Sequence, residues 1–347
     1  MDKTQLTYIV FTCVIFLALL FDLGLLSKKN KEISLEKALL QTAFWVLLSF
    51  AFCGFIWYEN IGGNGQEDAI QYISAYLLEW SLSIDNIFVF VIIFTYFKVK
   101  PENYSRILLL GILMAIVFRI VFIALGSELV ARFGWIMFVF GVFLVFTGVK
   151  MFSKPDEEEF NPSDNWAYRI IKRFLRTTDE EPNGRLTITR QGKTYFTSLF
   201  IVVIMLGLID IVFAIDSIPA VFSIIPDPSK KMLIYSSNIF AVLGLRSLFF
   251  LLRGAAGKFD FLQQGIGVVL LFIGVKMLLP LLKYAGIDEE KLHLPVWVSL
   301  VVIVSCILIS ILYSIYHKRR GIEEDNANKN LYIVQVAYPL HKIANII

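Results

Sequence analysis

Two short apolar segments of this chain each contain a pair of carboxylates, and the two segments are similar to one another. The first runs from Glu79 to Asp85 and the second from Asp210 to Asp216, so the acids of each pair stand six residues apart. An ionised carboxylate in an apolar segment is unfavourable unless it has a partner, and it marks a functional site by default. The two segments therefore predict a site for a cation.

The side chains available to such a site carry only oxygen. An amide or a hydroxyl residue follows the second acid of each pair. The candidate metal ligands are Glu79, Asp85, Asn86, Asp210, Asp216 and Ser217. Oxygen ligands suit Mg²⁺, Ca²⁺ and Mn²⁺, whereas Zn²⁺ and copper favour His and Cys. Ligand type leaves the choice among these three ions open.

Two arginines within apolar segments, Arg119 and Arg246, balance part of the acidic charge. Four carboxylates and two arginines leave two negative charges, which one divalent cation or two protons would neutralise. This equivalence predicts exchange of a cation for protons. Alternatively, Glu79 with Arg119 and Asp210 with Arg246 form ion pairs that orient helices and bind nothing.

Apolar helices must position these side chains, because 57% of the 347 residues are apolar and the mean hydropathy is +0.70. Stretches of about 20 apolar residues recur along the chain, and each can span a bilayer. We expect an all-α polytopic membrane protein with about nine transmembrane helices. The expected spans cover residues 6–26, 38–58, 70–97, 105–126, 133–152, 196–223, 232–252, 262–282 and 295–316. The net charge of +3 gives no indication of nucleic-acid binding.

The similarity between the two acidic segments extends over three helices. The motif Gly-Val-Lys-Met at 148–151 recurs at 274–277, in the same order after an acid pair and an arginine. Each unit crosses the membrane three times, which is an odd number, so the second unit is predicted to be inverted relative to the first. Inverted repeats of this kind are typical of transporters. Within the two acidic helices, Ser81, Ser83 and Pro219 predict local breaks that would expose carbonyl oxygens.

The distribution of Lys and Arg between the connections predicts that the N-terminus is outside and the C-terminus cytoplasmic. Lys150 and Lys276 lie near the ends of their spans, where we expect them to reach the interface. The stretch 185–196 is predicted to form a short hairpin. We expect the chain to divide into two N-terminal helices (1–60), a first repeat (70–152), a cytoplasmic loop (153–195), a second repeat (196–282), a last helix (295–316) and a cytoplasmic tail (317–347).

At these residues the chain resembles the TerC/Alx family of bacterial integral membrane proteins, which is related to the wider LysE-type transporters. The resemblance rests on the segment 79–90, on Phe-Ala-Ile-Asp-Ser-Ile-Pro-Ala at 213–220 and on Ser-Asn-Ile-Phe-Ala at 237–241. It implies a multi-pass protein of the bacterial inner membrane that exports metal ions, with manganese as the substrate. Family members often have Lys where this chain has Trp80, and Glu where it has Gly207.

We therefore expect a transporter, not an enzyme, that moves a divalent cation out of the cytoplasm, with Mn²⁺ favoured over Ca²⁺ and Mg²⁺. No other cofactor is expected, and the partners are the lipid bilayer and the ion. An alternative of a different class is a membrane scaffold for tellurite or metal stress resistance. It would recruit soluble stress-response proteins through the acidic and basic residues of the loop 153–195.

Overall fold

The computed structural model describes most of the apolar part of the chain. The described residues are 3–26, 34–59, 64–152, 169, 173, 175–178, 184–253, 261–285, 294–295 and 297–317. Within these ranges only the backbone is described at 3–6, 19–26, 85, 88, 216, 262 and 284–285. The side chains of Asp85 and Asp216, both predicted ligands, and the tail 318–347 therefore lie outside the described residues.

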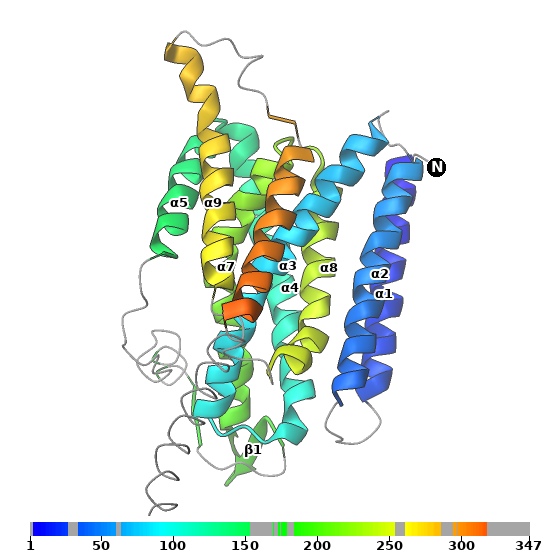
Figure 1. Ribbon diagram of the computed structural model, residues 1–347. Coiled ribbons are helices and arrows are strands. Elements are labelled where there is room, and N and C mark those ends of the chain that lie inside the picture. Colours follow the sequence, from blue (N-terminus) through cyan, green and yellow to red (C-terminus); the bar gives the residue numbers. More distant parts are fainter. Residues whose placement is uncertain are drawn as a thin grey trace, which may run out of the picture.

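Long helices run roughly parallel and antiparallel to form a bundle (Figure 1). They are α1 (Lys3–Leu26), α2 (Leu35–Glu59), α3 (Gly65–Tyr96), α4 (Pro101–Arg132), α5 (Ile136–Lys150), α7 (Ser198–Ile224), α8 (Lys231–Leu252), α9 (Leu262–Leu278, continued by a 3₁₀ turn Leu279–Ala285) and a last helix, Trp297–His317. Within the described residues, seven helices are long and apolar enough to cross a membrane, and shorter apolar helices cover Thr7–Ala18 and α5. The prediction of an all-α polytopic membrane protein is confirmed, and the count of nine spans stays a prediction.

The acidic helices α3 and α7 are continuous. Their backbones are helical through Ser81 and Ser83 and through Pro219, which lies inside α7. The helices are therefore not interrupted at these residues, and the exposure of carbonyl oxygens there stays a prediction. Proline is tolerated within a membrane helix when its neighbours are well packed, and Ala220, Val221 and Phe222, which follow Pro219, are fully buried.

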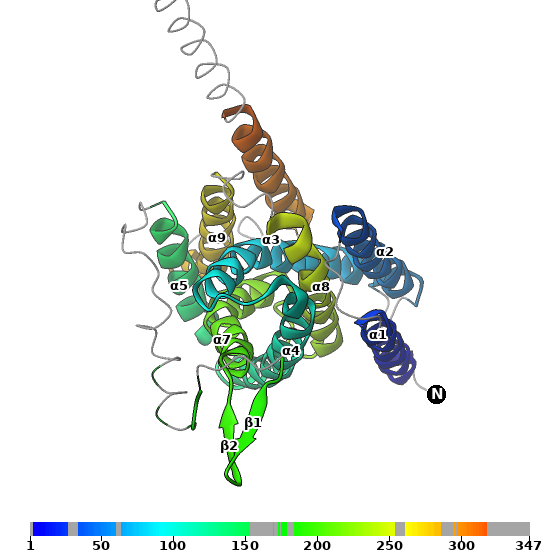
Figure 2. The same ribbon diagram turned by 90° about the horizontal axis from the view of Figure 1, so that it is seen from below.

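The helices pack in a reciprocal pattern around a central group of α3, α4, α7 and α8 (Figure 2). The first helix of one predicted repeat packs on the second helix of the other, since α3 contacts α8 and α4 contacts α7. The third helices, α5 and α9, pack on each other at one side of this group, and α2 packs on α3 and α8 at the other. Helix α8 is almost entirely enclosed.

Glycines bring α5 and α9 into close contact. A Cβ atom added to Gly141 would lie 3.1 Å from the Gly274 carbonyl oxygen, and one added to Gly148 would lie 2.9 Å from the Gly267 carbonyl oxygen. Gly148 and Gly274 occupy matching places in the two Gly-Val-Lys-Met motifs, so the same contact is made twice with the two units exchanged. Small residues allow helix backbones to approach closely in membranes.

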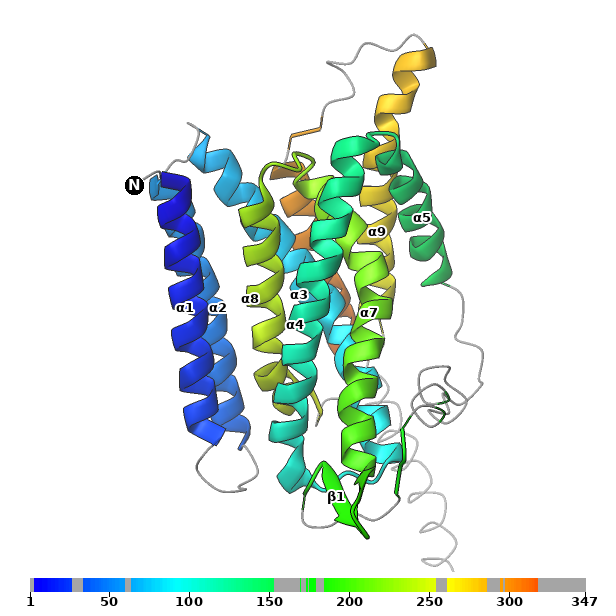
Figure 3. The same cartoon turned by 180° about the vertical axis from the view of Figure 1, so that it is seen from behind.

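The predicted hairpin is present at one end of the bundle, below α4 and α7 (Figure 3). Strand β1 (Thr187–Arg190) pairs antiparallel with β2 (Lys193–Phe196). Gln191 and Gly192 connect them with φ of 49° and 74°, as a two-residue hairpin turn requires. The hairpin is tied to α4 because Arg106 Nη1 donates to the Gly184 carbonyl at 3.1 Å.

Lys276 has a partner on the last helix, because its ammonium group donates to the hydroxyl of Ser299 at 2.9 Å. Its reach to the membrane interface stays a prediction. Ser299 is fully buried in the last helix, and Lys276 is half-buried in α9. A long side chain turns inward when a neighbouring helix offers an acceptor, so Lys276 joins α9 to the last helix. Lys150, its counterpart in α5, is exposed.

Candidate functional site

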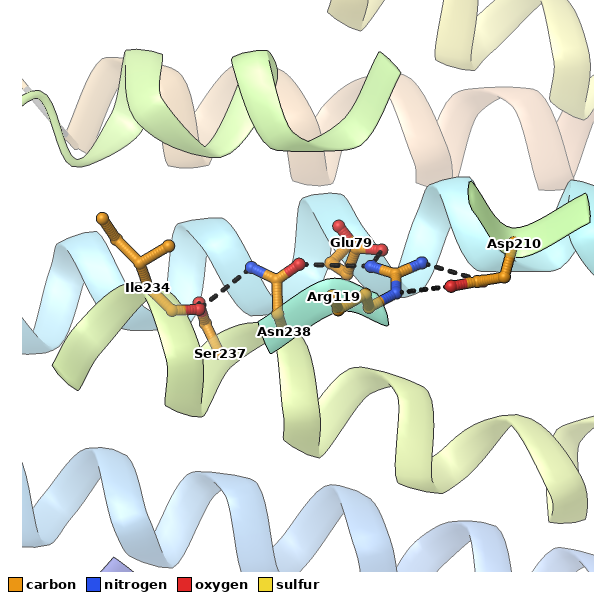
Figure 4. A network of polar contacts seen from close by, with 6 residues as sticks. All are labelled: Glu79, Arg119, Asp210, Ile234, Ser237 and Asn238. Carbon is orange, nitrogen blue, oxygen red and sulfur yellow. Dashed lines mark hydrogen bonds and ion pairs between the residues drawn. The ribbon is translucent and has the colours of Figure 1, made fainter. Parts of the chain in front are cut away.

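Arg119 lies at the centre of a buried polar cluster (Figure 4). Its Nε donates to Asp210 Oδ2 at 2.9 Å and its Nη2 donates to Asp210 Oδ1 at 3.1 Å. Its Nη1 contacts Glu79 Oε1 and also donates to Asn238 Oδ1 at 3.1 Å. Arg119, Glu79 and Asp210 are each only 1% exposed. The planar guanidinium thus binds one carboxylate with two parallel hydrogen bonds and a second carboxylate with another nitrogen.

Each of the four central helices contributes one member of this cluster. Glu79 comes from α3, Arg119 from α4, Asp210 from α7 and Asn238 from α8. One positive and two negative charges leave the cluster with a net negative charge. Burial of charged groups is unfavourable unless they are paired and hydrogen-bonded, so this excess charge makes the cluster a candidate site for a cation.

The pairing of acids with arginines differs from the expected one. Asp210 binds Arg119, which comes from the other predicted repeat, so a single arginine connects the two acids Glu79 and Asp210. Arg246 is buried in α8 at another level of the bundle, where its Nη1 lies 3.4 Å from Ser105 Oγ. Ser105 precedes Arg119 by fourteen residues, or about 20 Å along α4.

Asn238 is not among the site residues predicted from the sequence, which on this helix include only Arg246. The side chain is fully buried, and its Nδ2 donates to the Ile234 carbonyl at 3.0 Å. This bond directs Oδ1 toward Arg119 (Figure 4). The signal that could have identified it is the run Ser-Ser-Asn at 236–238 within an apolar helix.

Of the other predicted ligands, the structure describes the side chains of Ser217 and Asn86 but not those of Asp85 and Asp216. The Ser217 hydroxyl lies close to the Glu79 carboxyl but makes no hydrogen bond of normal geometry within the described chain. Asn86 is buried two helical turns after Glu79. Among the described residues no three His, Cys, Asp or Glu side chains form a group that could hold a metal ion. The six-ligand set therefore stays a prediction, because it needs the side chains of Asp85 and Asp216.

The space beside Gly207 is filled by a neighbouring side chain. A Cβ atom added to Gly207 would overlap Met114 Cε of α4. Gly207 stands where we expected relatives to carry a glutamate, three residues before Asp210. In this chain the position supplies no carboxylate oxygen and instead lets α4 and α7 pack together.

A second ion pair closes the end of the bundle remote from the hairpin. Lys230 Nζ donates to Asp68 Oδ1 at 2.7 Å and to Gln71 Oε1 at 3.1 Å. Asp68 and Gln71 are buried in the first turns of α3, and Lys230 precedes α8. An ion pair therefore joins α3 to the start of α8 at this end, in addition to the contacts of Arg119.

Comparisons with known proteins agree with the apolar architecture. The family model described as "Integral membrane protein TerC family" matches residues 64–321. An uncharacterized membrane protein of Rickettsia bellii (strain RML369-C) is 36% identical over 90% of this chain and 98% of its own length. A protein of Escherichia coli (strain K12) named "Putative membrane-bound redox modulator Alx" is 35% identical over 92% of this chain and 98% of its own length. No solved structure matches the chain.

Proposed function

The chain belongs to the TerC family of integral membrane proteins. We propose that it is a secondary transporter that exports a divalent cation in exchange for protons. Mn²⁺ is the proposed substrate, with Ca²⁺ and Mg²⁺ as the alternatives, because the available ligands are oxygens. Asp85 and Asp216 are the proposed central ligands, and Glu79 and Asp210 serve as ligands or proton carriers.

The bridge from Arg119 to Glu79 and Asp210 is the observation that carries this proposal. A divalent cation and a guanidinium compete for the same carboxylate oxygens and repel each other. Binding of the cation therefore displaces Arg119 from at least one acid, and its release lets the arginine return. Because the partners lie on different helices, this exchange changes the forces between the two halves of the bundle.

An inverted repeat of α3–α5 and α7–α9 is part of the proposal. The reciprocal packing of α3 on α8 and of α4 on α7 supports it, as does the paired glycine contact between α5 and α9. A two-fold axis in the membrane plane would produce this pattern. Rocking of such units around a midplane site gives alternating access.

Contacts at both ends of the bundle fit this cycle. The pair Lys230–Asp68 holds α8 to α3 at one end, and Arg106 holds the hairpin to α4 at the other. With the N-terminus outside, the hairpin faces the cytoplasm and Lys230 faces outward. Release of the cation to the outside then requires the Lys230–Asp68 pair to separate.

The alternative function, a scaffold for soluble stress-response proteins, depends on the loop 153–195, of which the structure describes 169, 173, 175–178 and 184–195. The relatives named redox modulators suggest a third role. Among the described residues the three cysteines are free thiols on separate helices. The charged cluster inside the bundle favours transport over both.

Uptake of metal into inside-out vesicles tests the proposed function. We expect Mn²⁺ to accumulate when a pH gradient is imposed, and accumulation to stop in Glu79→Gln, Asp85→Asn and Asp216→Asn. Glu128→Gln is the matched control, because Glu128 is an exposed acid on α4. Deletion of the acidic run 156–159 should leave uptake unchanged. Folded protein that moves none of Mn²⁺, Ca²⁺ and Mg²⁺ would overturn the proposal and favour the scaffold.

A further inference from the structure

Buried hydroxyl groups in this bundle usually bond to the preceding helical turn. Ser74 donates to the Ile70 carbonyl at 2.7 Å and Ser236 to the Met232 carbonyl at 2.7 Å. Thr42 and Ser310 make the same bond four residues back, at 2.8 and 2.7 Å. This bond satisfies a hydroxyl where no water or other polar group is near. A buried serine that lacks a partner is therefore an exception within this protein.

Four buried serines are such exceptions among the described residues. The hydroxyl oxygens of Ser81, Ser83, Ser127 and Ser217 have no hydrogen-bond partner there. Ser81 and Ser83 lie in the first acidic segment, Ser217 directly follows the second, and Ser83 is fully buried. An unpartnered buried polar group is destabilising and calls for an explanation. Because these groups gather at the acids, the explanation is to be sought in a ligand.

Ser83 lies one turn after Glu79 on the continuous helix α3. Residues four apart share a helix face, with Cβ atoms about 6 Å apart. The second oxygen of Glu79, Oε2, is also buried without a partner, while Oε1 binds Arg119. Ser217 of α7 lies close to the same carboxyl. Two unpartnered oxygens, Glu79 Oε2 and Ser217 Oγ, thus lie together beside Arg119, and the unpartnered Ser83 hydroxyl lies one turn away on the same face of α3.

Ser83 has no counterpart in the second repeat. The position that matches it, four residues after Asp210, is Ala214, which is buried and carries only a methyl group. We propose that the Ser83 hydroxyl is a further ligand of the transported cation, supplied by the first repeat alone. This inference rests on the transport function proposed above. A neutral oxygen adds coordination without adding charge, so it helps to select a hard divalent ion.

Removal of this one oxygen tests the inference. Ser83→Ala in the purified full-length chain should weaken Mn²⁺ binding, measured as the rise in unfolding temperature with added Mn²⁺, by about 5- to 10-fold. In vesicles the KM for Mn²⁺ should rise by about the same factor. Ser127→Ala is the matched control, because Ser127 is equally buried and equally unpartnered but lies outside the acidic segments. It should change neither value.

A soft ligand at the same position gives a second, independent measurement. Thiols favour soft ions over Mn²⁺, so Cd²⁺ should inhibit Mn²⁺ transport, and stabilise the protein against heat, at lower concentration in Ser83→Cys than in wild type or Ser127→Cys. The inference is overturned if Ser83→Ala keeps wild-type Mn²⁺ binding and KM, or if Ser127→Ala shifts them equally. Wild-type protein that binds Mn²⁺ without moving it would count against the transport function alone, and the binding comparison would still decide the role of Ser83. Wild-type protein that binds no Mn²⁺ would overturn both.

Discussion

Replacement of Arg119 by methionine should lower the free energy of unfolding more than any other substitution that removes one charged side chain among the described residues. Methionine retains the length and the apolar stem of the side chain but leaves Glu79 and Asp210 without their shared positive partner. Both carboxylates are buried, and the Asp210 bonds are 2.9 and 3.1 Å long. The substitution therefore leaves two uncompensated negative charges inside the bundle.

The expected loss follows from this burial. Removal of one partner of a buried ion pair typically costs about 3–5 kcal/mol, because the remaining charge stays desolvated. Arg119 has two carboxylate partners and one amide partner, so we expect a loss in the upper part of that range. The same change at Arg132, in an exposed pair with Glu128 on α4, should cost less than about 0.5 kcal/mol.

Unfolding of the detergent-solubilised protein by a graded denaturant would measure both free energies. The triple variant Glu79→Gln, Arg119→Met, Asp210→Asn removes all three charges and should recover most of the stability lost in Arg119→Met. Equal stability of Arg119→Met and wild type would refute the reasoning. So would a triple variant that is no more stable than Arg119→Met, because the loss would then come from packing and not from unpaired charge.

Three further predictions address the site, the packing and the surface. Asp85→Asn and Asp216→Asn should each abolish Mn²⁺ export without lowering the unfolding temperature, and export at the wild-type rate would remove these residues from the site. Gly274→Ala should lower the free energy of unfolding by about 1–3 kcal/mol, because the added Cβ atom would crowd α5. Gly54→Ala should be neutral or slightly stabilising, because a Cβ atom added there has no neighbour within 4 Å. The pKa of Asp227, in the exposed turn before α8, lies below its usual range because Ser229, two residues later, donates hydrogen bonds to its carboxylate, including one from its backbone N–H at 2.8 Å. The ionised Asp227 carboxylate therefore stabilises the folded protein above the usual aspartate pKa, and this stabilisation is lost as the pH falls through the lowered pKa of the folded state. The small difference in unfolding free energy between wild type and Asp227→Asn should accordingly shrink below about pH 4.

The positions of the helices could be predicted from hydropathy because a membrane helix satisfies its hydrogen bonds within its own segment. The predicted span 105–126 lies inside α4, which is longer and covers Pro101–Arg132. The difference arises because a helix continues past the apolar stretch when its ends carry favourable charges, and α4 has Glu102 in its first turn and Arg132 in its last.

The repetition of the acidic segments was also visible in the sequence, and with it Glu79 and Asp210 as candidate site residues. These residues stand out because a charge in an apolar segment is unfavourable, and this property is local. Their partners are not local. Arg119 is 40 residues from Glu79 and 91 from Asp210, and Asn238 is 119 residues from Arg119.

The sequence by itself therefore determined the membrane class, the approximate helices and which side chains are costly to bury. Only the tertiary structure decided that one arginine serves both acids, that Lys276 turns inward to Ser299, and that the Ser83 hydroxyl stays unpartnered. All the helices are similarly apolar, so their hydropathy does not specify which neighbours they meet. Neighbours are selected by close packing and by polar groups that meet between helices, and both depend on the assembled bundle.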